Sequence, residues 1–266
     1  MRLLIAVLNG RTARRIAAGM ELRGFDALIT ESGAQALQLL SREGVRVGAH
    51  VLSISSERDD ALDPLCPDME ALARCHAQPV PTLDPEAGSR MYAAIMEARA
   101  AGDSLGGVVE CAAVGLPAGL GAPFFEGVEA VMAAQLFSIP AVKGVEFGAG
   151  FAAAALRGSE YNDPYVMSDG RVATARNSAG GLLGGITSGM PIIVRAAFRP
   201  TPSISLEQQT VSLSQKAPTS LAVRGRHDPC VAVRAVPVVE GAVALALLEL
   251  WLERRASFPL ATREGL

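Results

Sequence analysis

A run of thirteen residues at 177–189 constrains this chain most, because five of the thirteen are glycines. Glycine lets the backbone approach a ligand closely, and it lets successive N–H groups converge on an anion. The run therefore indicates either a ligand-binding loop or a tightly turning loop, and its residues leave both possibilities open. It is neither a dinucleotide-binding fingerprint nor a P-loop, because no strand–loop–helix unit with G-x-G-x-x-G or G-K-[ST] occurs there.

The segment after the glycine run is apolar and then rigid. Residues 191–199 predict a strand, and two prolines at positions 200 and 202 stiffen its exit. The hydroxyls of Thr201 and Ser203 can donate to a phosphate or a ring carbonyl. A rigid turn at an edge strand would explain the same residues without a ligand.

The most concentrated polar cluster is Gly-Arg-His-Asp-Pro-Cys at 225–230. Arg226 can pair with a phosphate through two parallel hydrogen bonds. His227 can move protons near neutral pH, and Asp228 can orient a base or act as one. A local ion pair in a turn set by the following proline explains the cluster equally well.

Composition narrows the class of protein. The chain has 266 residues, 50% of them hydrophobic and 19% charged, which is enough for one large domain or two small ones. The net charge of -3 does not point to nucleic acid. Four cysteines without a C-x-x-C pair, and three histidines, lack the spacing of a metal site and suit a reducing cytoplasm.

Periodicity predicts a mixed architecture. Strands are expected at 1–8, 45–54, 108–114 and 191–199, and helices at 11–23, 33–43, 67–76, 89–101, 126–138 and 236–255. A glycine-rich stretch is expected at 143–150 and a polar loop at 157–176. Strands and helices mix without strict alternation, which favours an α+β fold.

No segment is expected to span a membrane or to act as a secretory signal. The most apolar stretch, 236–251, contains Pro237, Glu240 and Glu249, and it is too short and too charged to span a bilayer. The apolar start at 1–8 is too short for a secretory signal.

Taken together and in order, these segments resemble the chorismate synthase family. The runs that carry the resemblance are 103–107, 115–121, 141–148, 179–189, 200–204, 225–231 and 234–237. Their order and spacing match across about 100–255, and less closely from about 44. The resemblance implies an α+β fold of layered β-α-β sandwich type, incomplete at the N-terminus. It also implies one domain over 1–266, with a divergent or foreign segment at 1–43 and a family-like core at 44–255.

The family resemblance implies a reaction. Chorismate synthase is a cytoplasmic lyase of the shikimate pathway of aromatic amino acid biosynthesis. It removes phosphate from 5-enolpyruvylshikimate 3-phosphate by a 1,4-anti elimination, and it needs reduced FMN. The resemblance also implies a homotetramer and a link to NADP. It implies a small phosphorylated substrate as the partner, rather than nucleic acid or a membrane.

The resemblance also implies site residues. The flavin-contacting positions fall on Pro140, Ala141, Gly184, Arg199, Pro200, Thr201, Pro202, Ser203 and Arg226. Asp228 stands at the position associated with proton transfer, and His227 beside it is the second catalytic candidate. Arg199 replaces the usual lysine, and Pro140 stands where asparagine is common. We expect 200–204, the glycine run and 226–228 to converge around one anionic cofactor.

The first part of the chain departs from the family. Three segments of the family have no counterpart in this sequence. They are the Gly-Glu-Ser-His-Gly segment, the Arg-Pro-Gly-His-Ala-Asp run with the second histidine, and the Gly-Gly-Gly-Arg-x-Ser segment. The sequence therefore predicts weak turnover by this chain, and the alternative is a flavin-binding or oligomerising module without turnover. Residues 1–40 also resemble the start of a response-regulator receiver domain, but the acidic pair expected after the first strand is missing.

Overall fold

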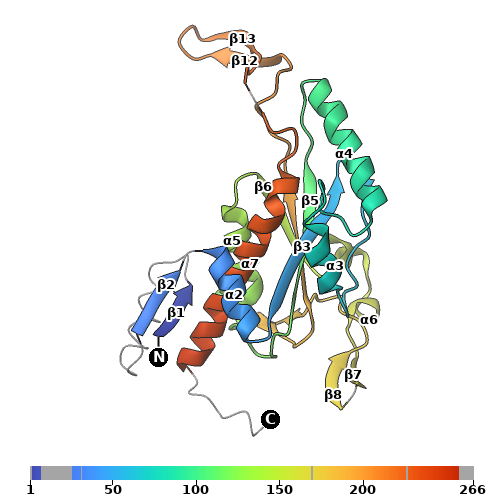
Figure 1. The fold of residues 1–266 in the computed structure, drawn as a ribbon, viewed down its shortest axis with the longest axis vertical. Helices are drawn as coiled ribbons and strands as arrows, with labels where there is room; N and C mark the ends of the chain where they lie inside the picture. Colours follow the sequence, from blue (N-terminus) through green and yellow to red (C-terminus); the bar gives the residue numbers. More distant parts are fainter. Residues whose placement is uncertain (1, 7–25, 31, 169, 226, 258–266) are drawn as a thin grey trace.

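The computed structural model describes residues 2–6, 26–30, 32–168, 170–225 and 227–257 (Figure 1). Its centre is a five-stranded sheet in the order β4-β3-β5-β11-β6, with every neighbouring pair antiparallel. The strands are β3 (Arg46–Ile54), β4 (Glu57–Arg58), β5 (Gly107–Val114), β6 (Val142–Phe147) and β11 (Ile192–Phe198). Together with the helices described below, this sheet confirms the α+β prediction.

One long helix organises the apolar face of the sheet. Helix α7 (Ala232–Ser257) packs against β3 and β5, and α2 (Gly33–Arg42) and α5 (Val128–Ser138) pack against α7. Helix α3 (Met69–Cys75) lies against β3. The predicted helices at 33–43, 67–76 and 126–138 are thus confirmed.

Helix α7 also corrects a sequence prediction. It begins before Pro237 and has 26 residues, so the expectation that this segment is too short to span a bilayer is wrong. By length and hydropathy, Ala232–Arg255 meets the criteria for a membrane span, with a mean hydropathy of 1.8. However, 83% of its most apolar stretch is buried inside the molecule, as in the core helix of a globular protein.

Helix α4 (Pro85–Ala100) begins four residues earlier than the predicted 89–101. The side chain of Asp84 accepts hydrogen bonds from the backbone N–H groups of Glu86 and Ala87, at 2.9 and 3.1 Å. An aspartate at the N-cap followed by proline in the first turn is a strong start signal, because both satisfy or remove donors that the helix leaves open. This signal, rather than apolar periodicity, sets the boundary.

The segment expected as a polar loop contains regular structure. Residues 157–176 include a short helix and a hairpin, and the glycine-rich stretch at 143–150 lies mostly in β6. The smaller elements between β5 and β11 are η1 (Phe124–Glu126), η2 (Gly150–Ala155), α6 (Gly158–Tyr161), β7 (Tyr165–Ser168), β8 (Arg171–Thr174), β9 (Leu182–Leu183) and β10 (Ile186–Thr187).

Two further strand pairs lie outside the central sheet. Strands β12 (Gln208–Ser212) and β13 (Ala217–Leu221) form a hairpin that extends away from the body of the molecule (Figure 1). Strands β1 (Arg2–Ala6) and β2 (Asp26–Thr30) pair in parallel, which confirms the strand predicted at 1–8. The helix predicted at 11–23 lies outside the described residues.

A row of charged side chains crosses the other face of the sheet. In the strand register, His50 of β3 lies opposite Glu110 of β5, which lies opposite Arg195 of β11, which in turn lies opposite Glu146 of β6. Residues directly opposite each other project from the same face, so these four side chains form one line across four strands.

The members of this row are joined by short contacts. His50 Nδ1 lies 2.9 Å from Asp59 Oδ2, and His50 Nε2 lies 3.1 Å from Glu110 Oε2. Arg195 donates to Glu110 Oε1 at 2.7 Å and to Glu146 Oε1 at 3.1 Å. The side chains of His50, Asp59 and Glu110 are fully buried, so their charges are balanced by one another rather than by water.

The buried part of the row shifts three pKa values. Burial opposes protonation of His50, but the hydrogen bonds and charges of Asp59 and Glu110 outweigh it and raise the pKa of His50. Burial favours the neutral form of both carboxyls. Hydrogen bonds from His50 and from backbone N–H groups outweigh that effect and lower the pKa of Asp59 and of Glu110. The row therefore favours the charged forms of all three groups more than water does.

These shifts predict a pH optimum for stability. The folded-state pKa of His50 lies above its ordinary 6.5, so its contribution is present below 6.5 and is lost as the pH rises through the folded value. Asp59 and Glu110 have folded pKa values below 3.8 and 4.5, so their contribution is lost as the pH falls through those values. Urea unfolding across the pH range should show a maximum at mildly acidic pH. In His50→Gln the loss of stability on the alkaline side should shrink, and an unchanged alkaline side would contradict this account.

Removing one carboxylate from the row should be costly. Glu110→Gln leaves His50 and Arg195 without their shared counter-ion, and we expect the free energy of unfolding to fall by about 3 kcal/mol. The matched control is Glu57→Gln, which breaks a 3.3 Å pair with Arg90 at the surface and should cost about 0.5 kcal/mol. The free energy of unfolding is measured by urea denaturation. Equal losses in the two variants would refute the claim that Glu110 stabilises the fold more than a surface ion pair does.

Candidate functional site

The predicted cofactor-binding residues at 140–141 and 199 meet at one end of the sheet. Strand β11 ends at Phe198, and its neighbour β6 begins opposite it at Val142. The backbone N–H of Arg199 donates to the carbonyl of Ala141 at 2.9 Å, so these two segments lie side by side. Ala141 has a φ of 75°, a left-handed conformation that non-glycine residues seldom adopt. Such strained positions cluster at functional sites.

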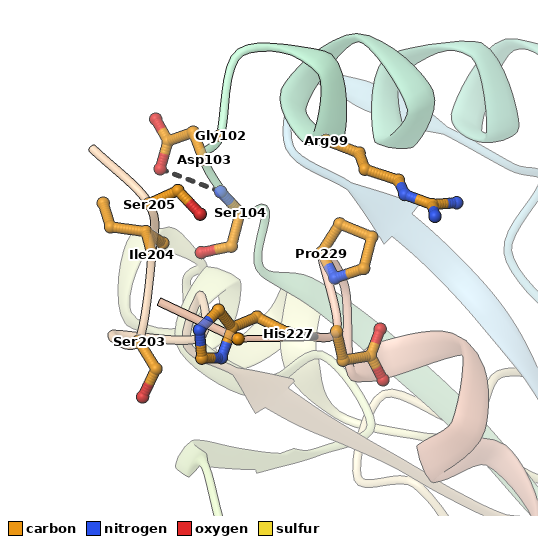
Figure 2. Close-up of a pocket in the computed structure, with 11 residues that line it drawn as sticks. Arg99, Gly102, Asp103, Ser104, Ser203, Ile204, Ser205, His227 and Pro229 are labelled. Atoms are coloured by element: carbon orange, nitrogen blue, oxygen red, sulfur yellow. Dashed lines mark hydrogen bonds between the residues drawn. The ribbon is translucent and has the colours of Figure 1, made fainter. Parts of the chain in front are cut away.

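A cavity of about 320 Å³ opens at the same end of the sheet (Figure 2). Three segments that are distant in sequence line it: the end of α4 with the residues that follow it, the segment after β11, and the segment before α7. The lining residues are Arg99, Gly102, Asp103, Ser104, Ser203, Ile204, Ser205, Gly225, His227, Asp228 and Pro229. The predicted residues Ser203, His227 and Asp228 therefore share one cavity.

Hydrogen bonds tie these three segments together. Ser104 Oγ donates to the carbonyl of Thr201 at 2.6 Å, and the N–H of Ser205 donates to the carbonyl of Gly102 at 2.9 Å. The N–H of Leu105 donates to the carbonyl of Pro229 at 2.7 Å. The segment at 102–105 thus holds both other segments, which predicts a preorganised rather than a loose site.

Two buried polar atoms at this end of the sheet have no hydrogen-bond partner among the described residues. They are Thr201 Oγ1 and His227 Nε2. A buried polar group without a partner costs about 1–3 kcal/mol, so such groups usually have a role. Figure 2 shows the side chains of Ser104, Ser203 and His227 gathered around the cavity, while the Arg99 side chain extends away from them. The unpartnered atoms Thr201 Oγ1 and His227 Nε2 are well suited to contact a polar ligand.

Asp228 is held by its own neighbours. Its Oδ2 lies 2.6 Å from a guanidinium nitrogen of Arg234, and its Oδ1 accepts the N–H of Cys230 at 3.2 Å. The ion pair with Arg234 fixes the direction of the carboxylate. Arg199 is exposed, and its guanidinium donates to the carbonyl of Pro200 at 3.3 Å. Arg226 lies outside the described residues.

The glycine run lies elsewhere. It directly precedes β11, whereas residues 199–203 directly follow it. A seven-residue strand spans roughly 20 Å, which separates the two segments. Asn177 supports the run by donating to the carbonyls of Pro64 and Pro191, both at 2.8 Å, and by accepting the N–H of Gly181 at 2.7 Å. At Gly181, with a φ of 80°, a Cβ would collide with the carbonyl of Pro191, so tight packing explains this glycine without a ligand.

Gly184 differs from Gly181. A Cβ at Gly184 would meet nothing within 4 Å, so its left-handed φ of 61°, rather than packing, favours glycine there. The end of the run, with Leu183, Ile186 and 187–189, lines a second and larger cavity of about 700 Å³, which shares no residue with the first. The expectation that all three predicted segments surround one cavity is therefore wrong for a single chain. The role of Gly184 in cofactor binding stays a prediction.

Sequence reasoning missed the contribution of the segment at 102–105. The run at 103–107 was part of the family resemblance, but no role was inferred for Ser104 or Asp103. The signal was present, because a polar pair follows the end of a predicted helix and precedes two glycines. What the residues do not show is that Ser104 bonds to a carbonyl 97 positions away.

Comparisons with known proteins agree on one family. The family model described as chorismate synthase matches residues 26–252. A chorismate synthase of Thermococcus gammatolerans is 45% identical over 249 residues, which is 93% of this chain and 65% of that protein. One of Methanosarcina acetivorans is 49% identical over 215 residues, which is 81% of this chain and 58% of that protein.

A solved structure supports the same assignment. A crystal structure of a chorismate synthase superimposes with a TM-score of 0.70 and 29% sequence identity, and the match covers 91% of this chain and 64% of that one. The chain thus spans about 65% of the length of the first curated relative that it matches.

Proposed function

This chain belongs to the chorismate synthase family, and we propose that it takes part in the elimination of phosphate from 5-enolpyruvylshikimate 3-phosphate to give chorismate, with reduced FMN as cofactor. The observation that carries the proposal is the shared cavity of Ser203, His227 and Asp228, because these residues stand in two of the family-like runs. The reaction removes one ring proton and expels phosphate from the substrate.

The residues present are suited to a flavin mononucleotide and a phosphorylated substrate. Thr201 Oγ1 and His227 Nε2 are buried polar atoms without partners among the described residues, and the exposed guanidinium of Arg199 has no carboxylate partner there. Hydroxyls, an imidazole and a guanidinium are the groups that bind phosphates and ring carbonyls. Pro140, Ala141, Pro200 and Pro202 supply backbone carbonyls and rigid walls next to them.

Each side chain has a task that follows from its surroundings. The guanidinium of Arg199 offsets negative charge, and the hydroxyls of Thr201 and Ser203 donate hydrogen bonds that orient the bound molecules. The carboxylate of Asp228, fixed by Arg234, accepts a proton in a defined direction. Reduced FMN, when bound, supplies the electron-rich flavin on which the elimination depends.

The Asp228 role leads to a kinetic prediction. Asp228→Asn keeps the shape of the side chain but removes its charge, and we expect kcat to fall by about 10²–10⁴-fold if Asp228 moves a proton. The measurement is chorismate formation under anaerobic conditions with reduced FMN, alongside an FMN titration by flavin fluorescence. FMN affinity should change little, because the hydroxyls and backbone groups remain.

The control is Asp60→Asn, which alters an exposed carboxylate outside the cavity. It should leave both turnover and FMN affinity unchanged. FMN binding by the wild-type chain with no chorismate formed would contradict the enzymatic part of the proposal. Failure to bind FMN would contradict the proposal as a whole.

The separation between Gly184 and residues 199–203 has a consequence for the oligomeric state of the protein. If one cofactor contacts both Gly184 and 199–203, two ends of β11 that lie roughly 20 Å apart must both reach it. We propose that the chain forms a homo-oligomer in which the glycine run of one copy meets residues 199–203 of another. A symmetric homo-oligomer repeats such a contact in every copy, so every site is completed in the same way.

Exposed apolar side chains surround Gly184 and support this assembly. Phe124 and Phe125 are 88% and 95% exposed, and the N–H of Val128, just beyond them, donates to the carbonyl of Gly185 at 2.9 Å. Leu183 and Ile186 on either side of the turn are also exposed. Contiguous exposed apolar surface of this kind marks an interaction site.

A shared site can be tested by mixing two defective chains. Gly184→Trp and Ser203→Trp each place bulk in one half of the site, and each variant alone should bind FMN poorly. In a co-expressed equal mixture, random pairing in a symmetric oligomer leaves about a quarter of the sites with both halves intact. FMN binding should therefore return to about that fraction.

If both halves came from the same chain, every site in the mixture would carry one defect. No recovery of FMN binding in the mixture would refute the shared site, while the cavity around Ser203 and His227 could still bind FMN in wild-type chains. A mixture of Gly184→Trp with itself, expressed from two plasmids, is the matched control.

A further inference from the structure

Another buried carboxylate faces a cavity separate from the one that contains Ser203 and His227. The cavity, of about 380 Å³, lies between α2, α3 and the first residues of β3, and Glu240 of α7 forms its inner wall. The other lining residues are Leu37, Ser41, Val45, Arg46, Val47, Gly48, Met69, Ala73 and His76. None of them lines the cavity of Ser203 and His227.

Only one oxygen of Glu240 is occupied. Its Oε1 accepts the N–H of Ala49 at 2.7 Å and lies 2.9 Å from Nε2 of His76. Among the described residues no group contacts Oε2. The side chain of Glu240 is only 8% exposed, whereas that of His76 is 38% exposed. A carboxylate buried to this extent is costly unless a donor or a cation completes it.

Among the described residues, the counter-charge of Glu240 comes from His76, whose side chain is 38% exposed. Arg46 lines the same cavity, but its guanidinium pairs with Glu70 at 2.8 Å. Burial raises the pKa of Glu240, and the nearby His76 only partly offsets that effect. A cation bound in the cavity would favour the charged form of this carboxyl.

Part of the wall is aliphatic, and the space is of ligand size. Leu37, Val45, Val47 and Met69 present aliphatic surface, and a volume of about 380 Å³ lies within the usual range for small-molecule sites. In the described part of the chain, no group of three or more His, Cys, Asp or Glu side chains could hold a metal ion. These features favour an organic cation over a metal.

We propose that this cavity binds a small organic ammonium compound, with its amino group on Oε2 of Glu240 and its apolar body against Leu37, Val47 and Met69. The ammonium group donates to the free oxygen and supplies a positive charge, and the hydrocarbon part covers the aliphatic wall. Neither the family resemblance nor the cavity of Ser203 and His227 assigns a ligand to this place.

Three aromatic probes of similar size and different charge test the proposal. Benzylammonium, benzyl alcohol and benzoate are titrated separately into the full chain near neutral pH by isothermal titration calorimetry. We expect saturable one-site binding of benzylammonium, at least about ten-fold tighter than benzyl alcohol, because a charged hydrogen bond replaces a neutral one. Benzoate should not bind. No saturable benzylammonium binding, or equal binding of the three probes, would overturn the proposal.

Two variants and a control locate the site. Glu240→Gln keeps the acceptor for Ala49 and should remove the advantage of benzylammonium over benzyl alcohol. Ala73→Leu on the exposed side of α3 fills the cavity mouth and should weaken benzylammonium about ten-fold without touching Glu240. Asp60→Asn, which alters an exposed carboxylate outside this cavity, should leave binding unchanged. Unaltered binding in Ala73→Leu would place the ligand elsewhere, even if Glu240→Gln fails to fold.

Discussion

The ion-paired row of His50, Glu110, Arg195 and Glu146 is the interaction on which the rest of the structure depends. It joins four neighbouring strands at one register position, and its buried half is shielded from water. A slip of one residue in any of these strands would turn its charged side chain into the apolar face beneath α7. The cost of burying an unpaired charge therefore fixes the register of the whole sheet.

A fixed register decides what lies at each end of β11. At one end, residues after Phe198 meet the start of β6, and the segment at 102–105 ties them to the turn before α7. At the other end, the glycine run turns back into the sheet, supported by the three hydrogen bonds of Asn177. The two family-like segments are thus presented at opposite ends, which is why an assembly of several copies enters the functional proposal.

Helix α7 links the two cavities. It begins directly after the segment that carries Asp228, and Arg234 in its first turn orients that carboxylate. One turn beyond Pro237, Glu240 caps the outward-facing N–H of Ala49 on β3 and borders the second cavity. The same buried helix therefore supplies a positioning charge to one site and the main charge of the other.

The local elements and the family could be predicted from the amino-acid sequence. Alternating and apolar runs identified β3, β5 and β11, and helical periodicity with a following glycine identified α2, because these signals depend only on neighbouring residues. The motif runs identified chorismate synthase resemblance, since several runs in the right order are specific together. Asp84 and Pro85 also mark the start of α4 as a local sequence signal, although apolar periodicity predicts a start four residues later.

Which distant residues come into contact could not be predicted from the sequence and became known from the folded structure. The two partners of His50, Asp59 and Glu110, come from a loop and another strand. Ser104 and Thr201 are 97 positions apart, and the glycine run is separated from Ser203 by the full length of β11. Helix α7 continues through Pro237 because its burial against the sheet outweighs one lost backbone hydrogen bond. Long-range pairing depends on strand register and on the burial of charge, and neither can be computed from neighbours along the chain.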